Sequence, residues 1–87
     1  MPLEHVFLAI ADLNRRTILE ELRRGPKTVG ELASGMPVTR PAVSQHLKVL
    51  LDAGLVGVTA QGTKRIYAID SDGFMKVNIW LDQFWSE

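Results

Sequence analysis

The chain has 87 residues, which is enough for one small domain with a limited hydrophobic core. Hydrophobic residues make up 46% of it, which argues against intrinsic disorder, and the absence of cysteine excludes disulfides and thiolate metal sites. The formal net charge is zero, but residues 37–69 hold four basic residues against one acidic residue. This segment therefore carries +3 and the remainder −3, a distribution suited to contact with a polyanion.

The first part of the chain predicts two helices. Residues 2–10 place apolar side chains at helical spacing, namely Leu3, Val6, Phe7 and Ile10. A second helix is expected from Leu13 to Arg24, with Asp12 as its N-cap and Gly25-Pro26 as its end.

The next part predicts a helix-turn-helix. Thr28 and Glu31 have the spacing of a capping box, which begins a short helix over Val29–Ser34. Thr39 can cap a longer helix that Gly54 would end, and Pro41 is tolerated in its first turn because no backbone donor is needed there.

The last part predicts a β-hairpin and a helix. Residues 55–60 and 63–69 are rich in β-branched and aromatic residues and flank the short join Gln61-Gly62. Residues 70–73 are expected to form a loop before an amphipathic helix over 74–85. The expected fold is therefore mainly α with a small β-hairpin, a winged helix-turn-helix. Residues 1–87 would form one domain, with a helix-turn-helix at 28–54, a wing at 55–69 and dimerisation helices at 2–11 and 74–85.

The helix expected after Thr39 has two different faces. One face is apolar and is expected to pack on the preceding helices: Val43, Leu47, Leu50 and Leu51. The other is polar and its first half is cationic: Arg40, Pro41, Ser44, Gln45, Lys48 and Asp52. Such a first half suits a DNA major groove, because arginine pairs with guanine and glutamine with adenine. A solvated helix face is the alternative.

The expected hairpin tip is also polar and basic, with Gln61, Thr63, Lys64 and Arg65. Such a tip can straddle the DNA backbone or enter a minor groove, and a solubilising turn is the alternative. We predict that Arg40, Pro41, Ser44 and Gln45 face base edges and that Thr39, Lys48, Lys64 and Arg65 face phosphates or a minor groove. Tyr67 is expected to pack rather than to stack on a base.

Three further polar residues have two interpretations each. His46 lies near the apolar side of its helix, so we expect a half-buried histidine at the junction with the helix over 29–34, with phosphate contact as the alternative. Arg15 and Arg16 oppose the dipole of the helix that they begin. Pairing of Arg16 with Asp12 and Glu20 on the helix surface would explain it, and phosphate contact is the alternative.

The two ends of the chain carry more large apolar residues than so small an interior can cover. This excess predicts a homodimer interface formed by Leu3, Val6, Phe7, Ile10, Val77, Trp80, Leu81, Phe84 and Trp85. One monomeric core that includes both helices is the alternative.

Several runs of the chain carry a family likeness: Asn14–Leu19 (NRRTIL), Thr28–Ala33 (TVGELA), Pro41–Leu50 (PAVSQHLKVL), Ala53–Val56 (AGLV) and Gly62–Tyr67 (GTKRIY). Together they resemble the ArsR (arsenic-repressor type) winged-helix transcriptional repressors over nearly the whole chain. The resemblance implies a homodimer, paired through its first and last helices, that binds a near-palindromic operator in double-stranded DNA and often represses its own operon.

Many members of that family release DNA when they bind a metal. Such a site needs several thiolate or imidazole ligands, and this chain has no cysteine and only His5 and His46, which the expected fold keeps apart. No metal and no other cofactor is therefore expected, and the chain is more similar to metal-independent members. The sequence identifies no small-molecule inducer.

Other classes of function have less support. The sequence shows no nucleophile with a base, no paired acids in a plausible cleft and no phosphate loop, so an enzyme is not expected. A protein-interaction module on the same scaffold is the alternative to a DNA-binding repressor, and the zero net charge favours it. No run approaches the ~20 apolar residues that a membrane span requires, and no leader pattern begins the chain, so we expect a cytoplasmic protein without a membrane partner.

Overall fold

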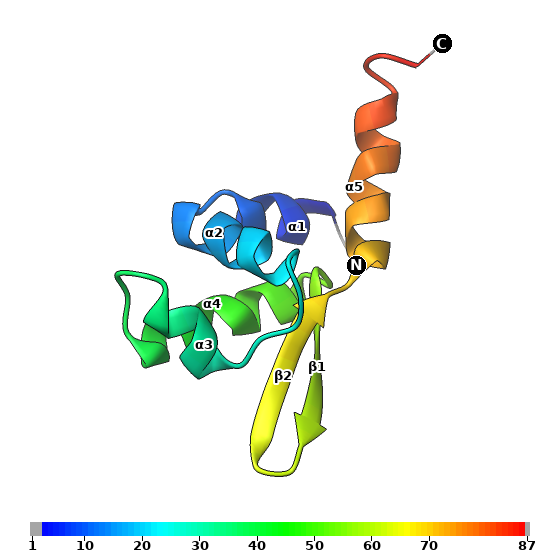
Figure 1. The fold of residues 1–87 in the computed structure, drawn as a ribbon. Coiled ribbons are helices and arrows are strands. Elements are labelled where there is room, and N and C mark those ends of the chain that lie inside the picture. Colours follow the sequence, from blue (N-terminus) through cyan, green and yellow to red (C-terminus); the bar gives the residue numbers. More distant parts are fainter. Residues whose placement is uncertain (1–2, 87) are drawn as a thin grey trace.

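Helices and one hairpin make up residues 3–86, the part of the chain that the computed structural model describes (Figure 1). The elements in chain order are α1 (Leu3–Ile10), α2 (Leu13–Leu22), α3 (Val29–Ser34), α4 (Arg40–Asp52), β1 (Val56–Gln61), β2 (Lys64–Ile69) and α5 (Ser71–Asp82). The order confirms the predicted winged helix-turn-helix. The molecule is elongated, 47 × 26 × 22 Å, and the hairpin and α5 project from opposite ends of the helical body.

The predicted N-caps begin the helices. The carboxylate of Asp12 accepts a hydrogen bond from the Arg15 N–H at 3.0 Å, and the Thr39 hydroxyl accepts one from the Ala42 N–H at 3.3 Å. Thr28 and Glu31 form the complete capping box. Each bond satisfies an N–H group that has no partner within its own helix. The first helix was expected to begin at Pro2, which lies outside the described residues.

The end of α4 is closed by the glycine that the sequence predicted. Gly54 has a φ of 77°, a left-handed conformation that glycine adopts without steric cost. Its N–H donates to the Leu51 carbonyl and the next N–H, of Leu55, donates to the Leu50 carbonyl, both at 3.0 Å. This pair of bonds is a Schellman motif, and it turns the chain from α4 directly into the hairpin.

Two boundaries before α5 differ by one or two residues from the prediction. Helix α2 ends at Leu22 rather than at Arg24. The hairpin turn is Gly62-Thr63 rather than Gln61-Gly62, because Gln61 still pairs with Lys64 across the strands. The φ of Gly62 is 61° and that of Thr63 is not positive, which suits a type II′ turn with glycine at its first central position.

Helix α5 begins three residues before the position that the sequence predicted. The Asp70 side chain accepts a hydrogen bond from the Asp72 N–H at 3.1 Å and caps a helix that ends at Asp82, so the predicted loop at 70–73 is instead the cap and first turn. The predicted end at Trp85 is also wrong, since the last residues of the predicted helix, 83–85, lie beyond Asp82.

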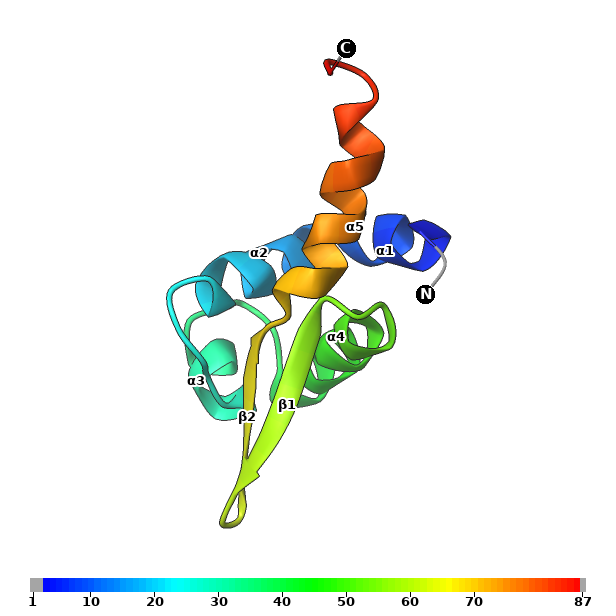
Figure 2. The same ribbon diagram turned by 90° about the vertical axis from the view of Figure 1, so that its right-hand side faces the viewer.

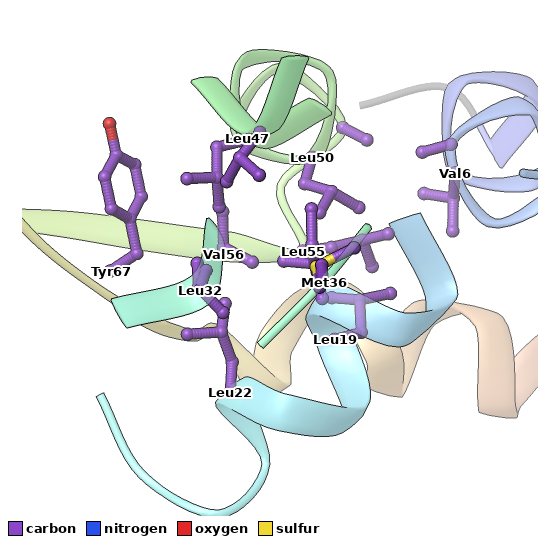
Figure 3. Close-up of a cluster of buried hydrophobic side chains, with 14 of the residues drawn as sticks. Val6, Leu19, Leu22, Leu32, Met36, Leu47, Leu50, Leu55, Val56 and Tyr67 are labelled. Atoms are coloured by element: carbon purple, nitrogen blue, oxygen red, sulfur yellow. The ribbon is translucent and has the colours of Figure 1, made fainter. Parts of the chain in front are cut away.

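One hydrophobic core joins the helical body to the base of the hairpin (Figure 3). Its largest fully buried side chains are Val6, Ile18, Leu32, Val43, Leu47, Leu50 and Leu55. Tyr67 is 7% exposed and packs against this core, as predicted. The backbone of Tyr67 also exchanges two hydrogen bonds with Lys27, at 3.0 and 2.8 Å, which fixes the α2–α3 loop to the wing.

The first turn of α5 packs directly on the backbone at the end of α4. Gly73 is buried, and a Cβ atom at this position would collide with the Gly54 carbonyl oxygen and lie 3.3 Å from a methyl group of Leu55. Val77, one turn on, is buried in the core. The second half of α5 projects away from the helical body (Figure 2).

We expect Gly73→Ala to lower the free energy of unfolding by about 1–3 kcal/mol, because α5 must move away from Gly54 to admit the methyl group. Chemical denaturation followed by circular dichroism measures this change. Gly57→Ala is the matched control, since no atom lies within 4 Å of its new Cβ. Equal midpoints for Gly73→Ala and the wild type would contradict the packing described here.

Candidate nucleic-acid interface

The N-terminal half of α4 presents the polar face that the sequence predicted. Thr39, Arg40, Pro41, Ser44, Gln45 and Lys48 are all exposed, whereas Val43 and Leu47 on the opposite face are completely buried. The first turn of α4 contains no acidic residue. The predicted base-reading side chains therefore share one solvent-exposed surface, which we call the reading face and define as Arg40, Pro41, Ser44, Gln45 and Lys48.

Lys48 lies at the end of the reading face and has an ionic neighbour. Its Nζ is 3.5 Å from a carboxylate oxygen of Asp52, one turn on, and both side chains are more than two-thirds exposed. An exposed pair of this kind contributes little to stability. Lys48 can therefore leave Asp52 for a phosphate at small cost.

A cleft of about 600 Å³ lies between α3 and the hairpin tip, next to the reading face. It is lined by Thr28, Val29, Gly30, Glu31, Ser34, Arg40, Thr63, Lys64 and Arg65. The structure thus brings three of the predicted DNA-contacting cations into one cleft. Gln61, also at the tip, is exposed but does not line the cleft.

The wall that α3 contributes to this cleft was not predicted. Thr28 and Ser34 add hydroxyl groups, which commonly bond phosphate oxygens. The sequence indicated only that Thr28 caps the helix and that Ser34 ends it, and in the structure the Ser34 hydroxyl donates to the Glu31 carbonyl. Their position opposite the wing follows from the tertiary fold.

Glu31 is the one acidic residue that lines the cleft. The backbone N–H of Thr28 and then its hydroxyl hold the pKa of Glu31 below its ordinary value, and Lys27 and Lys64 add a smaller effect in the same direction. The carboxylate accepts from the Thr28 N–H at 2.9 Å, so it is committed to the capping box. Its charge is partly balanced by Lys64 on the facing wing.

Arg40 extends from α4 across the surface of α3. A Cβ atom on Gly30 would lie 2.6 Å from Nη2 of Arg40 and 3.1 Å from its Cζ. The guanidinium therefore occupies the space that a side chain at position 30 would need. Gly30 is a residue whose importance the sequence did not indicate, because its neighbour is ten positions away.

His46 is half-buried as predicted, and its hydrogen-bonding neighbour lies on α2. Its Nδ1 lies 3.3 Å from Nη1 of Arg15. His46 also lies roughly 100° around α4 from Gln45, which turns it away from the reading face.

Arg15 and Arg16 serve the C-terminus of α1. Arg15 donates to the carbonyls of Ala9 and Leu8, and Arg16 donates to that of Ile10 at 2.8 Å. Between residues 3 and 86, neither arginine forms an ion pair, so the predicted pairing of Arg16 with Asp12 and Glu20 is wrong. The last carbonyls of a helix lack partners and carry partial negative charge, which explains the attraction.

The residues predicted for a dimer interface separate into three groups. Val6 and Val77 are buried in the core of their own chain, so they have almost no surface for a partner. A second group is half-buried against that core: Leu3, Phe7, Ile10 and Leu81. The third remains exposed: Trp80 (38%), Phe84 (65%) and Trp85 (65%). Trp80 stacks edge-to-face with Phe7 and Phe84, with ring centroids 5.0 and 4.9 Å apart.

Further exposed apolar residues extend this surface beyond the prediction. Met75 and Ile79 on α5 are 54% and 67% exposed, and Leu8 and Leu13 near the α1–α2 junction are 67% and 69% exposed. They lie on helix faces opposite those that pack on the core. They are therefore outside the apolar stripe of each helix from which the interface was predicted.

Residues 3–86 lack the features of two other classes of site. No three carboxylate or imidazole side chains there lie together so as to hold a metal ion. None of the helices in the same span has the length and apolar character that crossing a membrane requires.

The chain is similar to known bacterial regulators. Residues 12–58 match the family described as bacterial regulatory protein, arsR family. The HTH-type transcriptional regulator Rv2034 of Mycobacterium tuberculosis is 49% identical over 83 residues, which cover 95% of this chain and 78% of that protein. The transcriptional repressor SdpR of Bacillus subtilis is 29% identical over 94% of this chain and 91% of its own length.

A solved structure, described as the homodimeric winged helix-turn-helix DNA-binding domain of Mb0332 from Mycobacterium bovis, is also similar. It has a TM-score of 0.78 and 28% identity over 94% of this chain and 80% of that one. The relatives are transcriptional regulators, in agreement with the expectation that the chain is not an enzyme.

Gly30→Ala should displace Arg40 without unfolding the chain. The new methyl group meets only the end of an exposed side chain, and alanine favours a helix over glycine by up to about 1 kcal/mol. We expect an unchanged or higher thermal midpoint together with several-fold weaker binding to duplex DNA, measured by fluorescence anisotropy. Gly35→Ala, whose Cβ would have ordinary contacts, should change neither quantity. Full affinity in Gly30→Ala would show that this position of Arg40 does not matter for binding.

Proposed function

The chain belongs to the ArsR family of bacterial regulatory proteins, and we propose that this transcriptional regulator is a sequence-specific, DNA-binding repressor that acts as a homodimer. One observation carries the proposal: a cationic reading face without an acidic residue in its first turn lies beside a cleft that holds Arg40, Lys64 and Arg65. The name of the relative SdpR, a transcriptional repressor, supports the direction of regulation.

The reading face supports insertion of α4 into a major groove. Arg40 and Gln45 carry the donor and acceptor patterns that distinguish guanine and adenine, and Ser44 is small enough to approach either base edge or a phosphate. Pro41 shapes the first turn and offers an apolar contact. Thr39 and Lys48, at the two ends of this face, are placed to meet phosphates.

The cleft between α3 and the wing is suited to the DNA strand that separates two grooves. With α4 in the major groove, the hairpin tip lies toward the adjacent minor groove. The sugar-phosphate backbone between them would pass along the cleft, where Lys64 and Arg65 face it from the wing and Ser34 from α3. Gln61, outside the cleft, would meet the DNA only at the tip.

The exposed apolar surface of α5 supports dimerisation. Met75, Ile79 and Trp85 would be covered by a second copy, as would Leu8 near the end of α1. A two-fold dimer would place its two α4 helices in successive major grooves, ~34 Å apart, on a near-palindromic operator. The homodimeric relative from Mycobacterium bovis supports this assembly.

Regulation of its own operon follows from the family resemblance, and we include it in the proposal together with independence from metals. The chain has no cysteine, and one of its two histidines, His46, is engaged by Arg15.

A protein-interaction module is the second candidate, favoured by the exposed aromatic end of α5.

Gln45→Ala and Lys64→Ala should weaken DNA binding in different ways. Loss of a base-reading amide removes about 1–3 kcal/mol of discrimination between operator and scrambled duplex. Loss of a phosphate-contacting lysine weakens binding to both duplexes alike and reduces the salt slope by about one. Anisotropy titrations at several salt concentrations distinguish the two effects. The proposal fails if Gln45→Ala, Lys64→Ala and Arg40→Ala all match the wild type, a result that favours the protein-interaction module.

Ile79→Lys should convert the dimer into a folded monomer. Ile79 is 67% exposed within its own chain, so the substitution leaves the core intact while it places a charge in the apolar contact. Sedimentation equilibrium should therefore give half the wild-type mass. Val58→Lys is the control, because Val58 is also exposed (41%) but lies on the wing, and it should remain dimeric. A dimeric Ile79→Lys protein would place the interface elsewhere.

A further inference from the structure

We infer that Arg15 is a positioning residue that holds the end of α1 against α4 through His46, and that His46 supports DNA binding through this contact rather than by touching DNA. The inference rests on the proposed function, since α4 matters here as the helix that reads the operator. Its basis is the geometry of one side chain that contacts two other helices.

All three nitrogens of the Arg15 guanidinium are engaged. Nε donates to the Ala9 carbonyl at 2.7 Å and Nη2 donates to the Leu8 carbonyl at 3.0 Å, both at the end of α1. Nη1 lies 3.3 Å from Nδ1 of His46 on α4. Arg15 itself belongs to α2, so a single planar fork joins three helices, an arrangement that the ammonium group of lysine cannot reproduce.

The contact requires one particular tautomer of the His46 ring. An arginine side chain only donates hydrogen bonds, so Nδ1 of His46 must accept. The contact is therefore a hydrogen bond in the tautomer that carries its ring proton on Nε2. Two charged groups near the ring are the Arg15 guanidinium and the carboxylate of Asp12, whose pKa is lowered first by the bond from the Arg15 N–H and further by the charge of the Arg15 guanidinium.

The position of His46 on α4 favours this role over a phosphate contact. The ring is half-buried and follows Gln45 by one residue, which turns it roughly 100° from the reading face toward the junction of α1 and α2. Because Arg15 bonds both the end of α1 and His46, a movement of the end of α1 would change the orientation of α4. Because the exposed Leu8 lies at that same end, formation of the dimer and the orientation of α4 would be connected.

Two substitutions of His46 separate the two possible roles. His46→Asn retains an acceptor near the place of Nδ1 but removes Nε2, whereas His46→Gln retains a polar group near Nε2 but removes the acceptor for Arg15. We expect His46→Asn to bind a duplex selected from a random library by the wild type with nearly wild-type affinity, and His46→Gln to bind roughly tenfold more weakly, the size of one lost bond to a charged group. The reverse order would mean that His46 touches DNA and would overturn the inference.

A double-mutant cycle tests whether Arg15 and His46 act together. Arg15→Lys retains the charge and should also weaken binding roughly tenfold, and Arg15→Lys combined with His46→Gln should be no weaker than either single variant. Multiplied losses in the double variant would overturn the inference. Sedimentation and thermal denaturation must show that each variant remains dimeric and folded, and the His46 variants preserve the Arg15 bonds to α1.

A measurement without DNA keeps this inference separate from the proposed function. The ¹⁵N spectrum of the His46 ring in the full chain should show an unprotonated Nδ1 in the wild type, and a changed Nδ1 shift in Arg15→Lys. A proton on Nδ1 would overturn the contact itself. Failure of the wild type to bind either its upstream DNA or any selected duplex would overturn the proposed function, and with it the effect of His46 on binding, whatever this spectrum shows.

Discussion

The close approach of two backbones, at Gly54 and Gly73, is the contact on which the arrangement of the molecule depends. Gly54 ends α4 in a left-handed turn, its neighbour Leu55 is completely buried, and the first turn of α5 lies on the Gly54 carbonyl. The Asp70 N–H also donates to the Leu55 carbonyl at 3.0 Å, so the same junction holds the return of the chain from the wing. The reading helix, the hairpin and the helix assigned to dimerisation therefore meet at one point. In a dimer formed through α5, this junction would set the distance and angle between the two reading faces.

The polar side chains of residues 3–86 lie on the surface, and the candidate binding site is therefore formed there. Within residues 3–86 the core holds only hydrophobic side chains together with Tyr67, and no buried side-chain nitrogen or oxygen lacks a partner. The basic side chains on this surface form two groups. Arg15 and Arg16 complete the end of α1, whereas Arg40, Lys64 and Arg65 face an open cleft beside α4. A chain with no net charge can in this way present a cationic surface to DNA, while its acidic residues elsewhere favour one orientation on the polyanion.

Local signals in the sequence predicted much of the fold and the core of the site. Asp12, Thr28 with Glu31, and Thr39 are caps whose bonds span three residues, and the two faces of α4 follow from its apolar period. Contacts between distant residues could not be predicted in the same way. Asp70-Ser71-Asp72-Gly73 has the composition of a loop, and it begins a helix because Asp70 caps that helix and Gly73 packs on Gly54. Gly30 and Ser34 likewise acquire their roles from neighbours on other elements, which no pattern along the chain indicated. The position of Arg15 at the start of its helix was unusual in the sequence, but its partners on α1 and α4 could not be predicted.

We propose above all that the reading face and the adjacent cleft recognise a specific DNA sequence. Fluorescence anisotropy of the wild-type protein against its own upstream intergenic DNA and a scrambled duplex, over a series of salt concentrations, tests it most directly. We expect tight binding to the upstream duplex, much weaker binding to the scrambled one, and a linear fall of log K with log salt whose slope reflects the number of phosphates contacted. Equal and weak binding to both duplexes, with no slope, would contradict it.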